Sequence, residues 1–392
     1  MRRLTAHYII PVNAPPIKHG ILELSDTGTI LNIDGPFDVP VESANLEHYS
    51  GVLVPGFVNA HCHLELSHLS GKIPGKAGIP EFVSHMIDLN ASMPPAEARI
   101  LQAADRQMYA KGIVAVGDIS NGHASIATKK QSNVRYHSFI EVLEKGRPLS
   151  EVADFYQNLL ERFTKQGLLA SFVPHSAYAL QRETIDWLLS ANPEGPVSIH
   201  SQESESEDQL LQKGSGPLKE ALMNKGIPMD NFESPGCNAF QFFSSLLNAY
   251  KRKVLFVHNT YGEVEQMKQT SHELADATFV TCPNSNLFIE DTLPPLDKWY
   301  QAGFNVAVGT DSLASNGTLD ILGELYTIQR VFPQIPFEKL IEWATLNGAK
   351  ALNMAKDLGS FESGKCPGVN LITGFDVRSF KLRDNYKVKR LI

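Results

Sequence analysis

Short apolar runs rich in β-branched residues recur along most of the chain, and longer segments with apolar residues three and four positions apart separate them. The first pattern is typical of buried strands, and the second is typical of helices that pack on one face. We predict strands at residues 52–58, 113–116, 134–141, 168–173, 196–199, 254–257, 277–281 and 304–308. Helices are predicted within residues 94–112, 149–167 and 237–253, among other segments. Eight strands that alternate with helices predict an α/β fold, a (β/α)8 TIM barrel.

The two ends of the chain differ from the middle. Residues 8–51 alternate short β-like runs with turn residues such as Asp26-Thr27-Gly28, and they show no helical period. After a last predicted helix at residues 336–354, short strands and glycine-rich turns return. We therefore predict that residues 1–51 and 356–392 together form a small composite β-sandwich domain, while residues 52–355 form the barrel.

The first predicted strand runs directly into His61-Cys62-His63. Because side chains alternate along a strand, His61 and His63 point to the same side, with Cα atoms about 7 Å apart. Two imidazoles at that spacing can reach one metal ion at ~2.1 Å from each nitrogen. The alternative is a pair of histidines buried by packing, and the residues further along the chain decide between the two.

Polar residues follow several of the predicted strands. In a barrel of this kind the chemistry lies at the carboxyl ends of the strands, where such residues converge. The residues at these ends are His61, His63, His175, His200, His258 and Asp311. Three imidazoles and a carboxylate, from His61, His63, His200 and Asp311, suit a divalent transition metal. No lysine follows the fourth strand to bridge a second ion, so we predict one ion: zinc, with iron(II) or manganese(II) as alternatives.

The residues beside this ligand set suggest how a hydrolytic reaction would proceed. A metal site of this type lowers the pKa of bound water from 15.7 to about 7, so that hydroxide becomes the nucleophile. Glu203 lies three residues beyond His200 and is placed to carry the proton to a leaving group. The following acidic residues, from Glu205 to Asp208, are interpreted as a solvated face. His258 is either a fifth ligand or a hydrogen-bond partner of the hydroxide, and we favour the second because four ligands complete a mononuclear site.

Composition and charge exclude several other classes of protein. The net charge of -8, without long Lys/Arg runs, argues against a nucleic-acid partner. The four cysteines are far apart in the sequence, which suits a reducing cytoplasm, and no apolar run approaches the ~18 residues of a membrane span. We expect a cytoplasmic enzyme with a small-molecule substrate, which associates with neither nucleic acid nor membrane. Both a monomer and a homo-oligomer are open from the sequence.

Several segments together resemble the amidohydrolase superfamily: PGFVNAHCH, VSIHSQE, VLFVH, CPNSNL and VGTDS, followed by the GSFESGK return. Within it the chain is similar to the deaminase and chlorohydrolase branch, whose members remove an amino group or a halide from a ring carbon by hydrolysis. The resemblance implies that His61, His63, His200 and Asp311 bind the metal, with Asp311 also counted as catalytic. It implies that Glu203 is the proton shuttle and that His258 polarises the nucleophile.

Three further residues are candidates for substrate binding. Glu65 lies two positions past the histidine pair, as in the His-x-His-x-Glu-x-Ser run of aminodeoxyfutalosine deaminases, whereas S-adenosylhomocysteine deaminase-like members tend to have small or apolar residues there. Glu65 either binds substrate, such as a sugar hydroxyl, or is hydrogen-bonded to the barrel rim. His175 resembles a substrate-contacting position of the family, with a structural histidine as the alternative, and Glu141 at the end of the third strand is the weakest candidate. Cys282-Pro283-Asn284-Ser285-Asn286 is interpreted as a loop.

The hypothesis that follows is a metal-dependent aminohydrolase acting on an aminated purine ring. The substrate would be nucleoside-like, of the aminodeoxyfutalosine or adenosine type, attacked by metal hydroxide. One alternative is a deaminase or chlorohydrolase of guanine-type or triazine-type rings. The other is a non-catalytic metal-binding barrel scaffold, which the apparent retention of every ligand argues against.

Overall fold

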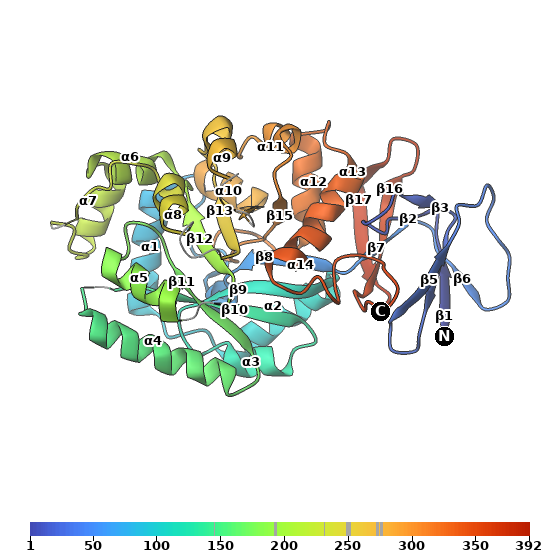
Figure 1. The fold of residues 1–392 in the computed structure, drawn as a ribbon, viewed down its shortest axis with the longest axis horizontal. Coiled ribbons are helices and arrows are strands. Elements are labelled where there is room, and N and C mark those ends of the chain that lie inside the picture. The colour runs from blue at the N-terminus through green and yellow to red at the C-terminus, as the bar shows by residue number, and fades with distance from the viewer. Residues whose placement is uncertain (145, 192–193, 231, 248–251, 272–273, 275–276) are drawn as a thin grey trace.

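The structure is a computed structural model of a mixed α/β protein (Figure 1). It describes residues 1–144, 146–191, 194–230, 232–247, 252–271, 274 and 277–392. The part of the chain between the terminal strands contains parallel strands with helices around them, and the strands from the two ends lie together at one end of the molecule. The predicted α/β fold is therefore confirmed.

Two four-stranded parallel sheets form the centre of the fold. The first has the order β11-β10-β9-β8 and consists of β8 (Phe57–Cys62), β9 (Ile113–Ser120), β10 (Arg135–Val142) and β11 (Leu169–Pro174). The second has the order β12-β13-β14-β15 and consists of β12 (Val197–Ser201), β13 (Val254–His258), β14 (Ala277–Thr281) and β15 (Val306–Val308). Strand β11 contacts β12, β15 contacts β8, and Cys62 forms an isolated parallel bridge with Asp311.

The first predicted strand, residues 52–58, is in fact divided between two sheets. Strand β7 (Val52–Pro55) pairs with β16 and β2 of the terminal sheet, whereas β8 begins at Phe57 and pairs with β9. Gly56 separates them at a point of close approach, because a Cβ there would lie 2.2 Å from Cγ1 of Val114 and 2.5 Å from the carbonyl oxygen of Pro367. Every residue of both strands is buried, and residues 52–58 contain no polar side chain, so the hydrophobic pattern alone gave no sign of the division.

Helices cover the parallel strands where the predicted periodicity places them. Helix α4, for example, buries Val152, Tyr156, Leu159 and Phe163, spaced four, three and four residues apart along one face. The helices are α1 (Gly78–Ser92), α2 (Ala98–Ala110), α3 (Ile126–Gln131), α4 (Leu149–Thr164), α5 (Arg182–Ala191), α6 (Glu205–Lys213), α7 (Pro217–Asn224), α8 (Ala239–Leu247), α9 (Val264–Ser271), α10 (Pro283–Glu290), α11 (Leu296–Ala302), α12 (Ile321–Val331), α13 (Phe337–Glu342) and α14 (Gly348–Ala351). A 3-10 helix, η1 (Leu64–Leu69), follows β8, and a π-helical segment, η3 (Trp343–Asn347), joins α13 to α14.

Two predicted local structures need correction. The segment that begins at Cys282 was predicted to be a loop, but it forms helix α10 with Pro283 in its first turn, where the missing proline N–H costs no helical hydrogen bond. The helix predicted at residues 237–253 begins as α8, and its residues 248–251 lie outside the described part of the chain.

The strands at the two ends of the chain form two further sheets. They are β1 (Arg2–Thr5), β2 (Tyr8–Ile9), β3 (Ile17–Lys18), β4 (Ile21–Leu24), β5 (Ile30–Asp34), β6 (Leu46–His48), β16 (Val369–Asp376) and β17 (Lys381–Arg390). One sheet has the order β5-β4-β1-β6, and the other has the order β17-β16-β7-β2-β3, so strands from both ends pair within one sheet. Leu4, Leu22, Leu53, Phe361 and Val369 belong to a small apolar core at this end of the molecule.

Candidate metal centre

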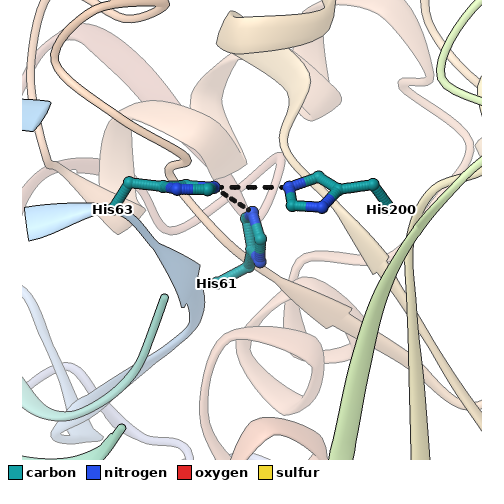
Figure 2. Close-up of side chains that lie close together, drawn as sticks. All are labelled: His61, His63 and His200. Atoms are coloured by element: carbon teal, nitrogen blue, oxygen red, sulfur yellow. Dashed lines mark hydrogen bonds between the residues drawn. The ribbon is translucent and has the colours of Figure 1, made fainter. Parts of the chain in front are cut away.

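Three imidazoles and one carboxylate converge at the carboxyl ends of β8, β12 and β15. The Nε2 atom of His63 lies 3.1 Å from Nε2 of His61 and 3.3 Å from Nε2 of His200 (Figure 2). Oδ1 of Asp311 lies 3.6 Å from Nε2 of His61 and 3.3 Å from Nε2 of His63. The ligand atoms of the three histidines lie within 4.8 Å of one another, and Asp311 lies beside two of them, although it is 250 residues from His61 in the sequence.

The geometry and the ionisation of these four residues both fit a single divalent ion. Four ligand atoms placed tetrahedrally at ~2.1 Å from an ion are about 3.4 Å from one another, close to the separations found here. Burial lowers the pKa of His63 and that of His200 to about 4, which leaves both imidazoles neutral at pH 7. Burial would raise the pKa of Asp311, but His61 and His63 hold it well below its usual range. Neutral imidazoles and an ionised carboxylate are the forms that bind metals.

Asp311 is held by residues on two neighbouring segments. Its Oδ2 accepts hydrogen bonds from the hydroxyls of Ser285, at 2.6 Å, and Ser315, at 2.7 Å, which leaves Oδ1 directed at the histidines. The backbone N–H of Asp311 donates to the carbonyl oxygen of His61 at 3.1 Å and so ties the end of β15 to β8. Neither serine was singled out from the sequence, because the segment that carries Ser285 was interpreted as a loop without a role.

His200 is oriented from its other ring nitrogen. Its Nδ1 lies 3.2 Å from the carbonyl oxygen of His175 and 3.6 Å from Oε1 of Glu141. A hydrogen bond from Nδ1 to the carbonyl places the proton on Nδ1 and leaves Nε2 with a free lone pair for an ion.

His258 and Glu203 lie beside the four candidate ligands. Nδ1 of His258 accepts a hydrogen bond from the side-chain amide of Asn286 at 3.2 Å, so Nε2 is the nitrogen that carries the proton. That Nε2 lies 3.5 Å from Oε1 of Glu203 and has no hydrogen-bond partner among the described residues. The His258 ring is stacked on His200 with centroids 5.7 Å apart. This arrangement is the one expected of a hydrogen-bond donor next to the metal ligands rather than of a fifth ligand.

The Glu203 carboxyl group has a strongly shifted affinity for protons. Burial raises its pKa well above the usual range, and the nearby carboxyl groups of Asp311 and Glu207 raise it further. A carboxyl group with a raised affinity for protons is suited to general acid and base chemistry.

Glu65 makes the contacts expected of a rim residue. Its Oε2 accepts hydrogen bonds from the backbone N–H groups of Asn121 and Gly122, each at 3.1 Å. Its Oε1 accepts from the backbone N–H of Ser125 at 3.3 Å and from the Ser125 hydroxyl at 2.9 Å. The carboxylate thus holds the segment between β9 and α3. These contacts correspond to the interpretation in which Glu65 is hydrogen-bonded to the barrel rim.

Glu141 and His175 form a hydrogen-bonded pair. Nδ1 of His175 lies 2.8 Å from Oε1 of Glu141, and the side-chain amide of Asn121 donates to Oε2 of Glu141 at 2.6 Å. The Glu141 side chain is only 4% exposed, whereas that of His175 is 30% exposed. Burial would raise the pKa of Glu141, but His175 and His200 hold it well below its usual range. Asn121, which the sequence analysis missed, links the segment held by Glu65 to this pair.

The acidic residues after Glu203 are not simply a solvated face. Glu205 is exposed, as predicted, but Glu207 is 3% exposed and its Oε2 accepts a hydrogen bond from the backbone N–H of Glu203 at 2.9 Å. Oδ2 of Asp208 accepts from the side-chain amide of Gln202 at 3.2 Å. The interpretation was wrong for Glu207 because counting charges along a sequence does not show which face of a helix they occupy.

A parallel α/β fold with three imidazoles and an aspartate meeting at its strand ends is the architecture of a metal-dependent hydrolase. A model of the amidohydrolase family matches residues 52–384. The chain belongs to the amidohydrolase family, as the sequence motifs predicted.

Known proteins agree with this assignment. The chain is 26% identical over 323 residues to an adenosine deaminase of Helicobacter pylori, covering 81% of this chain and 77% of the relative. The crystal structure of Helicobacter pylori aminofutalosine deaminase in complex with methylthio-coformycin superposes with a TM-score of 0.77 at 22% identity, covering 95% of this chain and 92% of the other. Atrazine chlorohydrolase TrzN from Arthrobacter aurescens TC1, complexed with zinc, gives a TM-score of 0.71 at 16% identity, with coverage of 98% and 90%. These two structures have the same fold as this chain.

None of the helices within the described residues has both the length and the apolar character needed to cross a bilayer. All four cysteines are free.

Proposed function

We propose that this protein is a metal-dependent aminohydrolase that removes the amino group from an aminated purine ring of a nucleoside-like compound. The observation that carries the proposal is the convergence of His61, His63, His200 and Asp311 on one point, with Glu203 and His258 beside it. The relative named adenosine deaminase and the solved aminofutalosine deaminase support a purine substrate of the adenosine or aminodeoxyfutalosine type.

The residues divide the chemistry among them. His61, His63, His200 and Asp311 would hold a divalent ion, which would lower the pKa of a water molecule to about 7 and so supply hydroxide as the nucleophile. Glu203 takes a proton from the attacking water and gives it to the ring nitrogen as the new carbon–oxygen bond forms at the amino-bearing carbon. It then takes the proton of the added hydroxyl group and gives it to the amino group, so that the carbon–nitrogen bond breaks and ammonia leaves. Nε2–H of His258 donates a hydrogen bond to the oxygen that adds to the ring, which stabilises the developing charge. Water is consumed and ammonia is released in each cycle.

We also propose that the two parallel sheets form one closed (β/α)8 barrel over residues 52–355. The contacts of β11 with β12 and of β15 with β8, together with the Cys62–Asp311 bridge, support closure at both seams. Residues 1–51 and 356–392 form the composite β-sandwich domain, and the pairing of β16 and β2 with β7 adds residues 52–55 to it, so that the first strand of the barrel is β8.

His175 is the proposed substrate contact at the mouth of the site. Its partial exposure supports this role, because a residue must be accessible to touch a ligand. Direct substrate contacts by Glu141 and Glu65 stay predictions, since both carboxylates already hold protein groups. We also propose that the protein associates with a small molecule, assembles into a homo-oligomer and is located in the cytoplasm.

A second candidate is hydrolysis of a triazine or guanine-type ring, including removal of a halide. The structural similarity to atrazine chlorohydrolase favours it. A non-catalytic metal-binding scaffold is disfavoured, because Glu203 and His258, which metal binding alone does not require, lie beside the candidate ligands.

Product release from a panel of compounds tests these candidates. Zinc-loaded protein is incubated with adenosine, 5′-methylthioadenosine, guanine and atrazine, and ammonia and chloride are measured. Ammonia release from the adenosine-type compounds alone is expected. Turnover of only guanine or atrazine would favour the second candidate, and turnover of none, with one zinc bound, would contradict both.

A further inference from the structure

The segment that joins β12 to α6 contains only three residues, and it carries Glu203 in the middle. Strand β12 ends at Ser201 and helix α6 begins at Glu205, with Ser204 as its N-cap residue. Gln202 has a φ angle of +49°, a left-handed conformation that is uncommon for residues other than glycine. Such a conformation persists only where the surrounding structure holds it, so the position of Glu203 depends on what fixes this short turn.

Glu207 contacts the turn from inside the helix. Its Oε2 accepts the backbone N–H of Glu203 at 2.9 Å, and its own N–H donates to the Ser204 hydroxyl at 3.1 Å. In a capping box the third helical residue bonds back to the N–H of the N-cap residue. Here the carboxyl group reaches one residue further back, to the residue whose side chain lies beside His258.

Helix capping alone does not explain this arrangement. The Ser204 hydroxyl already satisfies an N–H of the first turn, and a capping-box glutamate works equally well at the surface. Glu207 is instead 3% exposed, and burial of a carboxyl group is unfavourable unless a specific interaction offsets it. Glu205, two residues earlier in the same turn, is exposed, so the turn does not bury its carboxyl groups in general.

We propose that Glu207 is a positioning residue that fixes the backbone of Glu203, and with it the direction of the proton-transferring carboxyl group. The inference rests on the proposed role of Glu203 in proton transfer. Within the described residues, the Glu207 carboxyl group hydrogen-bonds to the backbone of the turn and to none of the four candidate ligands. Its removal therefore leaves metal binding intact and slows the chemical step.

The test compares four variants of the full, zinc-loaded protein with adenosine and 5′-methylthioadenosine as substrates. Glu207→Ala is expected to lower kcat by ~10-fold to 100-fold with unchanged zinc content and little change in KM, because a lost orienting contact costs about that much. Glu207→Gln is expected to recover most of this loss, since the amide oxygen accepts the same N–H group. Glu205→Gln removes a neighbouring charge from the same helical turn and serves as the matched control, with kcat unchanged.

The fourth variant separates positioning from helix stability. Ser204→Ala removes the N-cap hydroxyl but keeps the bond between Glu207 and Glu203, so it is expected to lower Tm without a comparable loss of kcat. Equal kcat for Glu207→Ala and the unmodified protein would overturn the proposal, as would a loss that Glu207→Gln does not recover or that Ser204→Ala reproduces. Glu203→Gln, measured in parallel, distinguishes failure of the proposed role of Glu203 from failure of the proposed role of Glu207. If it retains full activity, the proposed proton-transfer role of Glu203 fails; if it is inactive while Glu207→Ala is fully active, only the positioning role fails.

Discussion

The two sides of the candidate site are built differently. On the metal side, His61, His63, His200 and Asp311 lie close together, and two of them are restrained from behind: Asp311 by two serine hydroxyls and His200 by the carbonyl oxygen of His175. On the candidate substrate side, hydrogen bonds connect Glu65 to Asn121, Asn121 to Glu141 and Glu141 to His175. Asn121 is exposed, and the side chain of His175 is 30% exposed. Residue type is thus a good guide to metal ligands, whereas polar residues at a rim are as often supports for their neighbours as contacts for substrate.

The largest effect is expected from removal of the metal. Treatment with a chelator should lower turnover by ~10³-fold or more, because the activated nucleophile is lost, and added zinc should restore it. Metal content by elemental analysis and ammonia release by a coupled assay are measured on the same samples. Full turnover by metal-free protein would show that the four converging residues are not a metal centre.

Glu203→Gln should lower kcat by ~10²-fold or more, because the amide cannot transfer the proton, while the bound zinc stays at one ion per chain. The glutamine has nearly the same shape, so Tm is expected to change little. A fully active Glu203→Gln variant would exclude the role of Glu203 in proton transfer and would leave the four candidate ligands as the functional residues of the metal side.

Ser315→Ala should weaken zinc binding by ~10-fold to 100-fold, because it removes one of the two hydroxyls that hold Oδ2 of Asp311. Competition with a chromophoric chelator measures the affinity. Ser92→Ala, at an exposed serine on α1, is the control. Unchanged affinity in Ser315→Ala would show that the Ser315 hydroxyl is not needed to orient Asp311.

Asn121→Ala probes the substrate side. It removes the amide that donates to Glu141, so the pair with His175 loses a support, and KM should rise by ~10-fold while zinc content stays unchanged. Asn32→Ala, in the sheet of terminal strands, is a matched control for removing an asparagine amide. A fall in zinc content would show that the two sides of the site are not independent.

The smallest effect is expected from a substitution of Glu324, a buried acidic residue that is not among the four candidate ligands. Its carboxyl group accepts hydrogen bonds from Asn284 and Asn316, and burial raises its pKa to about 8. Because the folded pKa exceeds the unfolded value of about 4.5, the native protein binds the extra proton, and this contribution to stability is lost as pH rises from ~4.5 through 8. Glu324→Gln should therefore flatten the pH dependence of the free energy of unfolding over this window, measured by urea denaturation. An unchanged slope would show that Glu324 is already ionised at neutral pH.

The four candidate metal ligands could be predicted from local patterns, but most of the residues that hold them in place could not. The alternation of side chains along a strand places His61 and His63 on one face, and the rule that chemistry lies at the carboxyl ends of parallel strands selects His200 and Asp311. Ser285 and Asn286 were missed because Pro283 and the surrounding asparagine and serine residues are equally typical of a turn and of a helix start.

The sequence by itself determined the order of strands and helices, the family and the candidate ligands, because these depend on periodicity and on residue chemistry at fixed spacings. Only the tertiary structure decided that the first apolar run divides at Gly56. It also decided that Glu207 is the buried member of the acidic run after Glu203, and that Asn121 joins Glu65 to Glu141. These features depend on close approach between segments that are distant in the chain, such as Gly56 with Pro367. No local pattern of residues specifies which segments come into contact, because that choice depends on how the whole core packs.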